Sequence, residues 1–101
     1  MQPTGNIVII SVMILDVVNA EYLEDFKIHL FFSNNDDFQV DLKSTIYSDH
    51  RKIFEPLRSV NYFKSFKIRL NTITWDNEAD FAPEFLLALG KSQLAETLSF
   101  H

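Results

Sequence analysis

The side chains of this 101-residue chain that are able to do chemistry are few and lie far apart. No two of the three histidines, His29, His50 and His101, have the spacing of paired metal ligands. The absence of cysteine excludes a disulfide, a thiolate metal site and a cysteine nucleophile. The two glycines cannot form a glycine-rich phosphate loop, and no G-x-S-x-G motif is present. We therefore expect no catalytic residue, no metal, no cofactor and no enzyme activity.

Carboxylates gather at two places in the sequence. Asp36 and Asp37 are adjacent, but aspartate is common in turns. The loop at residues 76–80 holds three carboxylates and one amide, and oxygen-rich loops can hold Ca²⁺. It lacks the spacing and the central glycine of an EF-hand loop, so we expect a solvated loop that leads into a helix. Asp80 is then expected to accept a hydrogen bond from a free backbone N–H at the helix start.

Charge is distributed unevenly along an acidic chain. Nine Lys and Arg stand against 14 Asp and Glu, which gives a net charge of −5. Residues 51–69 carry six basic side chains and one acidic one, and both flanking segments are acidic. The net acidity argues against general DNA binding, for which a domain pI above about 9 is usual. We expect the basic segment to pair with its acidic neighbours, and the alternative is contact with an anionic partner.

Length and composition fit one folded domain over residues 1–101, with 47% apolar and 14% aromatic residues. The run Ile7–Val18 is rich in Ile and Val, which favours a strand, with residues 19–25 as its connection. Residues 1–13 are an N-terminal extension or part of this first strand. The run is too short to span a bilayer and no basic residue precedes it. We therefore expect a cytoplasmic protein without a membrane contact.

Alternation of apolar and polar residues predicts two β-hairpins. The first joins residues 26–32 to residues 38–42 through a polar turn at 33–37. The second joins residues 66–70 to residues 73–75 through a tight turn at Asn71. The apolar residues of the second hairpin that we expect to face inward are Phe66, Ile68, Leu70, Ile73 and Trp75.

The polar faces of the two hairpins are expected to lie together if all strands join one sheet. The residues on that face are Lys27, His29, Phe31, Gln39, Lys67, Arg69, Thr72 and Thr74. We favour simple exposure to water, which is common for one face of an antiparallel sheet. An aromatic ring among basic and amide side chains is the alternative signal, because Phe and Arg are enriched in interface cores. The candidate interface residues are therefore Phe31, Lys67 and Arg69, together with Arg58 of the basic segment.

The first helical segment is expected between the hairpins, at residues 49–64. Ile53, Leu57 and Val60 recur there at the spacing of one helix face. A proline within the segment divides it into two short helices, the second capped by Ser59.

The second helical segment is expected at residues 82–98. Pro83 and Glu84 suit its first turn. Gly90 is expected to end or interrupt it. Residues 88–101 are expected to form a C-terminal helical tail. Together these elements predict an α+β fold, in which a small antiparallel sheet of two hairpins and an N-terminal strand packs against short helices.

Residues 75–86 resemble the C-terminal signature of a small bacterial family, domain of unknown function 2442. That signature is Trp, Pro-Asn-Gly, a small residue, Asp, an apolar residue, Ala-Pro-Glu and an apolar pair. The residues that match it here are Trp75, Asn77, Asp80, Pro83 and Glu84. Further matches in the family's order extend the resemblance over about Ile14 to Leu87.

The chain departs from the family pattern at its turns. Asp76 and Glu78 replace the usual Pro and Gly of the signature loop. Asn34-Asn35 stands where the family favours Asp-Gly, and Ser59 replaces an Asp. The turn between Leu70 and Ile73 is shorter than the family's usual one.

The resemblance implies an α+β domain without an established activity. Some relatives look like regulators, and others are thought to be antitoxin-like partners of a second small protein. We treat the signature residues as structural. We expect a non-catalytic module that binds a protein partner, antitoxin-like or inhibitory in role, and a homodimer through an uncovered strand edge is compatible with this. The alternative is a small nucleic-acid-binding or transcription-regulatory accessory domain that uses residues 51–69.

Overall fold

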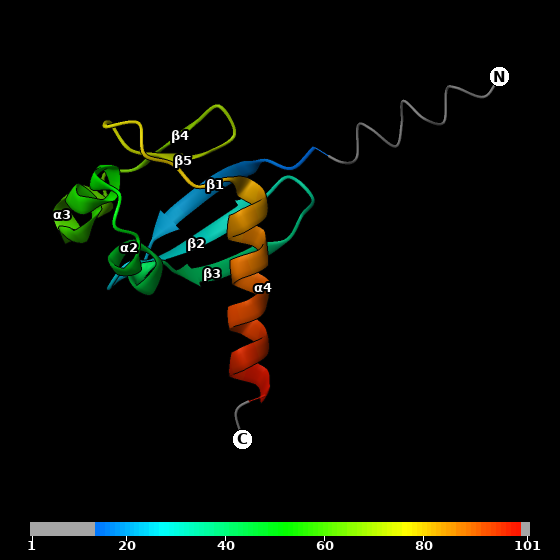
Figure 1. Ribbon diagram of the computed structural model, residues 1–101. Helices are drawn as coiled ribbons and strands as arrows, with labels where there is room; N and C mark the ends of the chain where they lie inside the picture. Colours follow the sequence, from blue (N-terminus) through cyan, green and yellow to red (C-terminus); the bar gives the residue numbers. More distant parts are fainter. Residues whose placement is uncertain (1–13, 100–101) are drawn as a thin grey trace.

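The computed structural model describes residues 14–99 and has an α+β fold (Figure 1). A three-stranded antiparallel sheet, a separate two-stranded hairpin and a long C-terminal helix dominate it. The elements in chain order are β1 (Val17–Tyr22), β2 (Lys27–Phe32), β3 (Asp37–Asp41), α2 (Lys43–Ser48), the 3₁₀ helix η1 (Lys52–Arg58), α3 (Val60–Phe63), β4 (Lys67–Arg69), β5 (Thr72–Thr74) and α4 (Pro83–Ser99). Residues 1–13, the expected N-terminal extension, lie outside the described residues.

The three-stranded sheet has the order β1-β2-β3, so β2 is central and the other two strands form the edges. The predicted first hairpin is confirmed as β2 and β3. Along β2 the side chains of Ile28, Leu30 and Phe32 are buried, and those between them are half-buried. The alternation seen in the sequence therefore does separate the core face from the outer face.

The expected boundary of the first strand is wrong. Residues from Asn19 to Tyr22 belong to β1 and pair with β2, although the sequence suggested a connection there. The actual connection is short and uses left-handed backbone at Asp25 and Phe26, with φ of 48° and 68°. Asn and Glu within residues 19–21 have low strand propensity, but pairing with β2 outweighs it.

Three short helices follow β3. The two predicted helices of segment 49–64 are present as η1 and α3, whereas α2 was not expected. The inward face is corrected: Ile53 and Val60 are exposed, and Phe54 is buried beside Leu57. A 3₁₀ helix has about three residues per turn, so a spacing of four does not keep residues on one face. Ser59 precedes α3 but makes no side-chain capping bond.

The second hairpin does not join the main sheet, so the expectation of one shared outer face is wrong. β4 pairs only with β5, and this hairpin packs beside β1. Ile68 and Leu70 are exposed rather than inward, and Thr72 is buried rather than outward. Of the residues of β4 and β5, only Ile73 belongs to the hydrophobic core. Trp75, the first residue after β5, is buried in the core as well.

Helix α4 is continuous, so Gly90 neither ends nor interrupts it. Gly90 instead allows close contact with β3, because a Cβ at this position would lie 2.7 Å from the Cβ of Phe38. Leu86 is buried, and Leu94 and Leu98 are exposed. The C-terminal end of α4 extends beyond the sheet (Figure 1).

One hydrophobic core joins all these elements except β4, whose three residues are exposed. Its largest fully buried side chains are Trp75, Phe63, Ile28, Leu30, Leu42, Ile46, Leu57, Ile73 and Leu86. Within residues 14–99, no helix has the length and apolar character needed to cross a membrane.

Candidate functional site

Over the described residues, the outer edge of β3 has no neighbouring strand in the main sheet. The Leu42 N–H donates to the Phe26 carbonyl, and the Phe32 N–H donates to the Asp36 carbonyl. These two bonds fix the phase of the β2–β3 ladder, because hydrogen-bonded pairs alternate with non-bonded pairs. The backbone groups of Asp37, Gln39 and Asp41 must therefore point away from β2.

A glutamine of α4 satisfies one of these three residues. The Asp41 N–H donates to Gln93 Oε1 at 2.9 Å, and Gln93 Nε2 donates to the Asp41 carbonyl oxygen at 3.0 Å. The side-chain amide thus makes the two bonds that a neighbouring strand would make. In the described part of the chain, no group bonds in this way to the backbone of Asp37 or Gln39.

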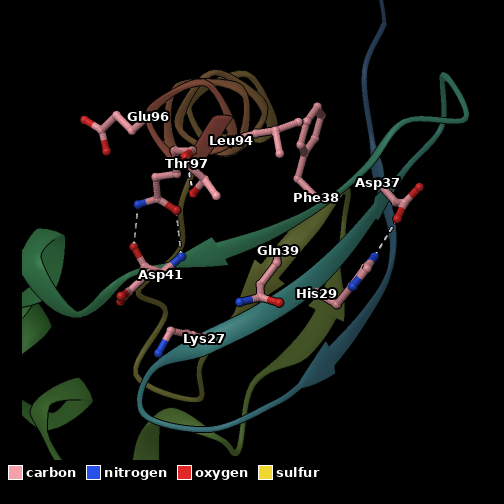
Figure 2. A pocket seen from close by; sticks show the side chains of 10 residues that line it. Lys27, His29, Asp37, Phe38, Gln39, Asp41, Leu94, Glu96 and Thr97 are labelled. Atoms are coloured by element: carbon pink, nitrogen blue, oxygen red, sulfur yellow. Dashed lines mark hydrogen bonds and ion pairs between the residues drawn. The ribbon is translucent and has the colours of Figure 1, made fainter. Parts of the chain in front are cut away.

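A groove of about 540 Å³ runs along this edge, between β3 and α4 (Figure 2). One wall is apolar, because Phe38 of β3 points toward Leu94 of α4. The side chain of Gln39 lies on the opposite face of the strand. The residues that line the groove are Lys27, His29, Asp37, Phe38, Gln39, Asp41, Gln93, Leu94, Glu96 and Thr97.

The other side of the groove is charged. His29 Nε2 lies 2.6 Å from Asp37 Oδ2, and its ring stacks on Phe31 with centroids 4.6 Å apart. Lys27 lies opposite Asp41 in the register and 4.0 Å from the carboxylate of Asp25. Three lining carboxylates stand against one lysine and one histidine.

A second cavity, also about 540 Å³, lies between the short helices and the start of α4. Its polar side chains include Asp49, His50, Arg51 and Asp80. The hydrogen bond and ion pair from Arg51, at 2.7 Å, lower the pKa of Asp49 to about 2. Asp49 in turn raises the pKa of Arg51. No group of three metal-ligating side chains occurs among residues 14–99. The charges of Asp49 and Arg51 in this cavity are thus paired with each other.

The four predicted interface residues do not form one surface. Phe31 is half-buried in the main sheet and stacks on His29. Lys67 and Arg69 belong to the separate hairpin, and both approach the carboxylate of Asp76, at 3.8 and 2.9 Å. The two basic side chains therefore pair with a neighbouring acid, as the charge distribution suggested.

Arg58 has a local role in the packing of the short helices. Its guanidinium lies over the Tyr47 ring, 5.4 Å from the centroid. It donates long hydrogen bonds to the carbonyl oxygens of Tyr47 and Asp49, at 3.5 and 3.4 Å. The side chain thus joins η1 to the end of α2.

Two of the signature residues organise the loop after β5. Trp75 is fully buried, and its indole N–H donates to the Phe63 carbonyl at 2.7 Å. Asn77 Nδ2 donates to the Ile53 carbonyl at 2.8 Å, and its Oδ1 accepts from the Ala79 N–H. Both contacts are internal, which fits structural roles for these two residues.

The other three signature residues lie around the start of α4. Pro83 is the first helical residue and is buried, and Glu84 is the acidic residue of the first turn. The capping role expected of Asp80 is not observed: the helix begins three residues later. Asp80 instead forms an isolated backbone bridge with Thr74. The loop is thus held by backbone pairing rather than by the aspartate side chain.

Sequence reasoning missed the roles of two residues that build the groove, Gly90 and Gln93. Their signal was weak, because a glycine in a helix suggests a break and a glutamine suggests a solvated surface. Only contact between α4 and β3 gives these two residues their roles. Leu94 is half exposed at the groove.

These features define a small α+β domain whose candidate site is a strand edge beside a long helix. The chain belongs to the family described as "Protein of unknown function (DUF2442)", whose model matches residues 17–92. The resemblance that the signature suggested is therefore confirmed. The searches found no matching curated protein and no matching solved structure.

Proposed function

We propose that this protein is a non-catalytic binding module that acts through a protein partner. The observation that carries the proposal is the open edge of β3, where the backbone groups of Asp37 and Gln39 face a groove. Unpaired backbone groups on a strand edge are a template for pairing with another chain, and natural proteins usually cover them. Here Gln93 covers the edge only at Asp41.

An antitoxin-like or inhibitory role is the specific form of this proposal. Such a protein forms a stoichiometric complex with its partner. It needs no catalytic group, because binding alone is enough to inhibit the partner. The groove supports binding better than turnover, because Thr97, whose hydroxyl is the only one among the lining residues, donates to the Gln93 carbonyl and not to the His29–Asp37 pair.

Co-purification followed by reconstitution tests the proposal. The tagged protein is expressed in its native cells, and the proteins that co-purify are identified. Each candidate is then purified separately and mixed with this protein, and the mass of the complex is measured in solution. We expect one candidate to re-form a complex of fixed stoichiometry. Repeated failure of every candidate to re-form a complex from pure components would contradict the proposal.

The nucleic-acid alternative makes a different prediction in the same experiment. Phosphate contacts release counterions, so nucleic acid bound through residues 51–69 would be lost steeply as salt rises. The pairing of Arg51 with Asp49, and of Lys67 and Arg69 with Asp76, supports the protein partner instead. Recovery of nucleic acid that salt releases would favour the alternative.

A further inference from the structure

We infer that the groove between β3 and α4 binds an extended segment of the partner, in which apolar and basic side chains alternate. This inference rests on the proposed function and adds to it a site, a binding mode and a chemical class. The mode is strand addition, in which an extended peptide pairs with an exposed sheet edge.

The backbone of β3 supplies the pairing groups. Asp37 and Gln39 are two residues apart and both direct an N–H and a C=O outward. A residue of an antiparallel partner strand can make both bonds with one such residue. The bound segment can pair with the backbone of Asp37 and Gln39. It cannot continue to Asp41, because Gln93 already bonds to the backbone of that residue. The glutamine thus limits the length of the paired stretch.

The two faces of β3 differ, and this difference determines the alternation. Side chains of an added strand point alternately to the two faces of the sheet. On one face they would meet Phe38 and Leu94, which favours apolar residues. On the other face they would lie beside the carboxylate of Asp41 and that of Asp37, which also bonds to His29, and these acids favour Lys or Arg. Alternating apolar and basic residues therefore fit both faces at once.

The same charges argue against a second copy of this chain as the occupant. Antiparallel pairing of two β3 edges would place the carboxylates of Asp37 and Asp41 on the same face of a joint sheet. Like charges facing each other across strands are destabilising. The chain also has a net charge of −5, which favours a basic partner over a second copy.

Selection from a library of random peptides tests the chemical class. Peptides of about ten residues, a length that suffices for one added strand, are displayed on phage and selected for binding to the full chain. We expect the enriched sequences to alternate apolar with basic residues. Enrichment of sequences without this alternation, or no enrichment at all, would overturn the inference.

Variants of the edge and of the helix wall test the site. Gln39→Pro removes the outward N–H without removing a bond to β2, because proline is tolerated on strand edges at such positions. Leu94→Asp places a charge on the apolar wall, and Leu98→Asp is its matched control one turn further along α4, outside the lining. We expect the first two variants to weaken binding of a selected peptide by at least about tenfold, and the control to change it by less than about twofold.

Backbone methylation of the selected peptide tests the binding mode. In strand addition only every second peptide N–H bonds to the edge. N-methylation at alternate positions in one phase is therefore expected to abolish binding, whereas methylation in the other phase is tolerated. Equal losses in both phases, or equal affinities of the Leu94→Asp and Leu98→Asp variants, would contradict strand addition in this groove.

Failure of this inference can be distinguished from failure of the proposed function. If a reconstituted partner complex is unaffected by Gln39→Pro and Leu94→Asp, the protein binds a partner elsewhere and the groove is not the site. If the chain forms a homodimer that Gln39→Pro dissociates, a second copy occupies the edge and the inferred basic segment is wrong. If no complex can be reconstituted, the proposed function itself fails.

Discussion

The two β-hairpins of this protein have similar sequence patterns but are buried in different ways. In β2 of the first hairpin, buried and half-buried side chains alternate along the strand, so the face determines burial. In the second hairpin, burial depends on which of the two strands a residue belongs to. Both faces of β5 are covered at Thr72 and Ile73, whereas all three residues of β4 are exposed.

The difference comes from what lies next to each hairpin. The first hairpin has α4 and the core on one face and water on the other, which is the usual environment of an antiparallel sheet. In the second, both strands lie near β1, but only β5 is also bridged to the loop before α4, through Thr74 and Asp80. Alternation predicts burial only when a strand has one covered face, and β4 has none.

The turns of the two hairpins differ as well. The first turn places Asn35 in the left-handed region, with φ of 74°, and the second places Leu70 there, with φ of 60°. Asparagine adopts this conformation readily, but a leucine rarely does. Leu70 is fully exposed, so burial of its side chain does not offset the strain.

Substitution of the paired isoleucines of the second hairpin has the largest expected effect. Ile68 and Ile73 lie directly opposite each other, yet their exposed fractions are 39% and 0%. Ile73→Ala is expected to lower the free energy of unfolding by about 2–5 kcal/mol, whereas Ile68→Ala costs less than about 1 kcal/mol. Urea denaturation of both variants measures this. Equal losses would show that alternation, not strand position, controls burial in this hairpin.

Gly90→Ala tests how the first hairpin is held against α4. The added Cβ would lie 2.7 Å from the Cβ and 2.8 Å from the Cγ of Phe38, so strand and helix must move apart. We expect a loss of about 1–2 kcal/mol in unfolding free energy, because overpacking outweighs the better helix propensity of alanine. Thermal or urea unfolding measures the loss.

The control for this variant is the double variant with Phe38→Ala. Removing the ring should make the added methyl group at position 90 neutral or stabilising relative to Phe38→Ala alone. If Gly90→Ala costs the same in both backgrounds, close contact with Phe38 is not the reason for the glycine.

Substitution in the turns has a smaller expected effect, of opposite sign. Leu70→Gly is expected to raise the free energy of unfolding by about 0.5–1 kcal/mol, because glycine relieves the left-handed strain at some cost in chain entropy. Asn35→Gly should change it by only about a few tenths of a kcal/mol, since asparagine tolerates this backbone. Differential scanning calorimetry of both variants compares them. A destabilised Leu70→Gly variant would mean that the leucine side chain contributes to the fold.

Removal of the hairpin's ion pairs has the smallest expected effect. Asp76 pairs with Lys67 and Arg69, and all three side chains are largely exposed. Asp76→Asn is expected to cost less than about 1 kcal/mol of unfolding free energy, and the difference should shrink as salt rises. Urea denaturation at low and high salt checks this. A larger loss that does not depend on salt would show that the aspartate has another role.

The local pattern of residues was sufficient to predict much of the fold. The alternation of residues 26–32 and 38–42 identified the first hairpin with its core face, and Pro83 identified the first turn of α4. The signature around Trp75 identified the family, and the match over residues 17–92 confirms it. Each of these signals depends on neighbours in sequence, because strand period and helix start are local properties.

The tertiary structure alone decided where the strands lie and what covers them. Glu78 adopts a φ of 73° at the position where the family favours glycine, so pairing between Trp75 and Ala79 holds a residue that does not prefer this backbone. The groove depends on two contacts between residues that lie 52 positions apart in the sequence, Gln93 with Asp41 and Gly90 with Phe38. A sequence pattern reports which face of an element is apolar. It does not report which distant element covers that face, because this depends on how all the elements pack together.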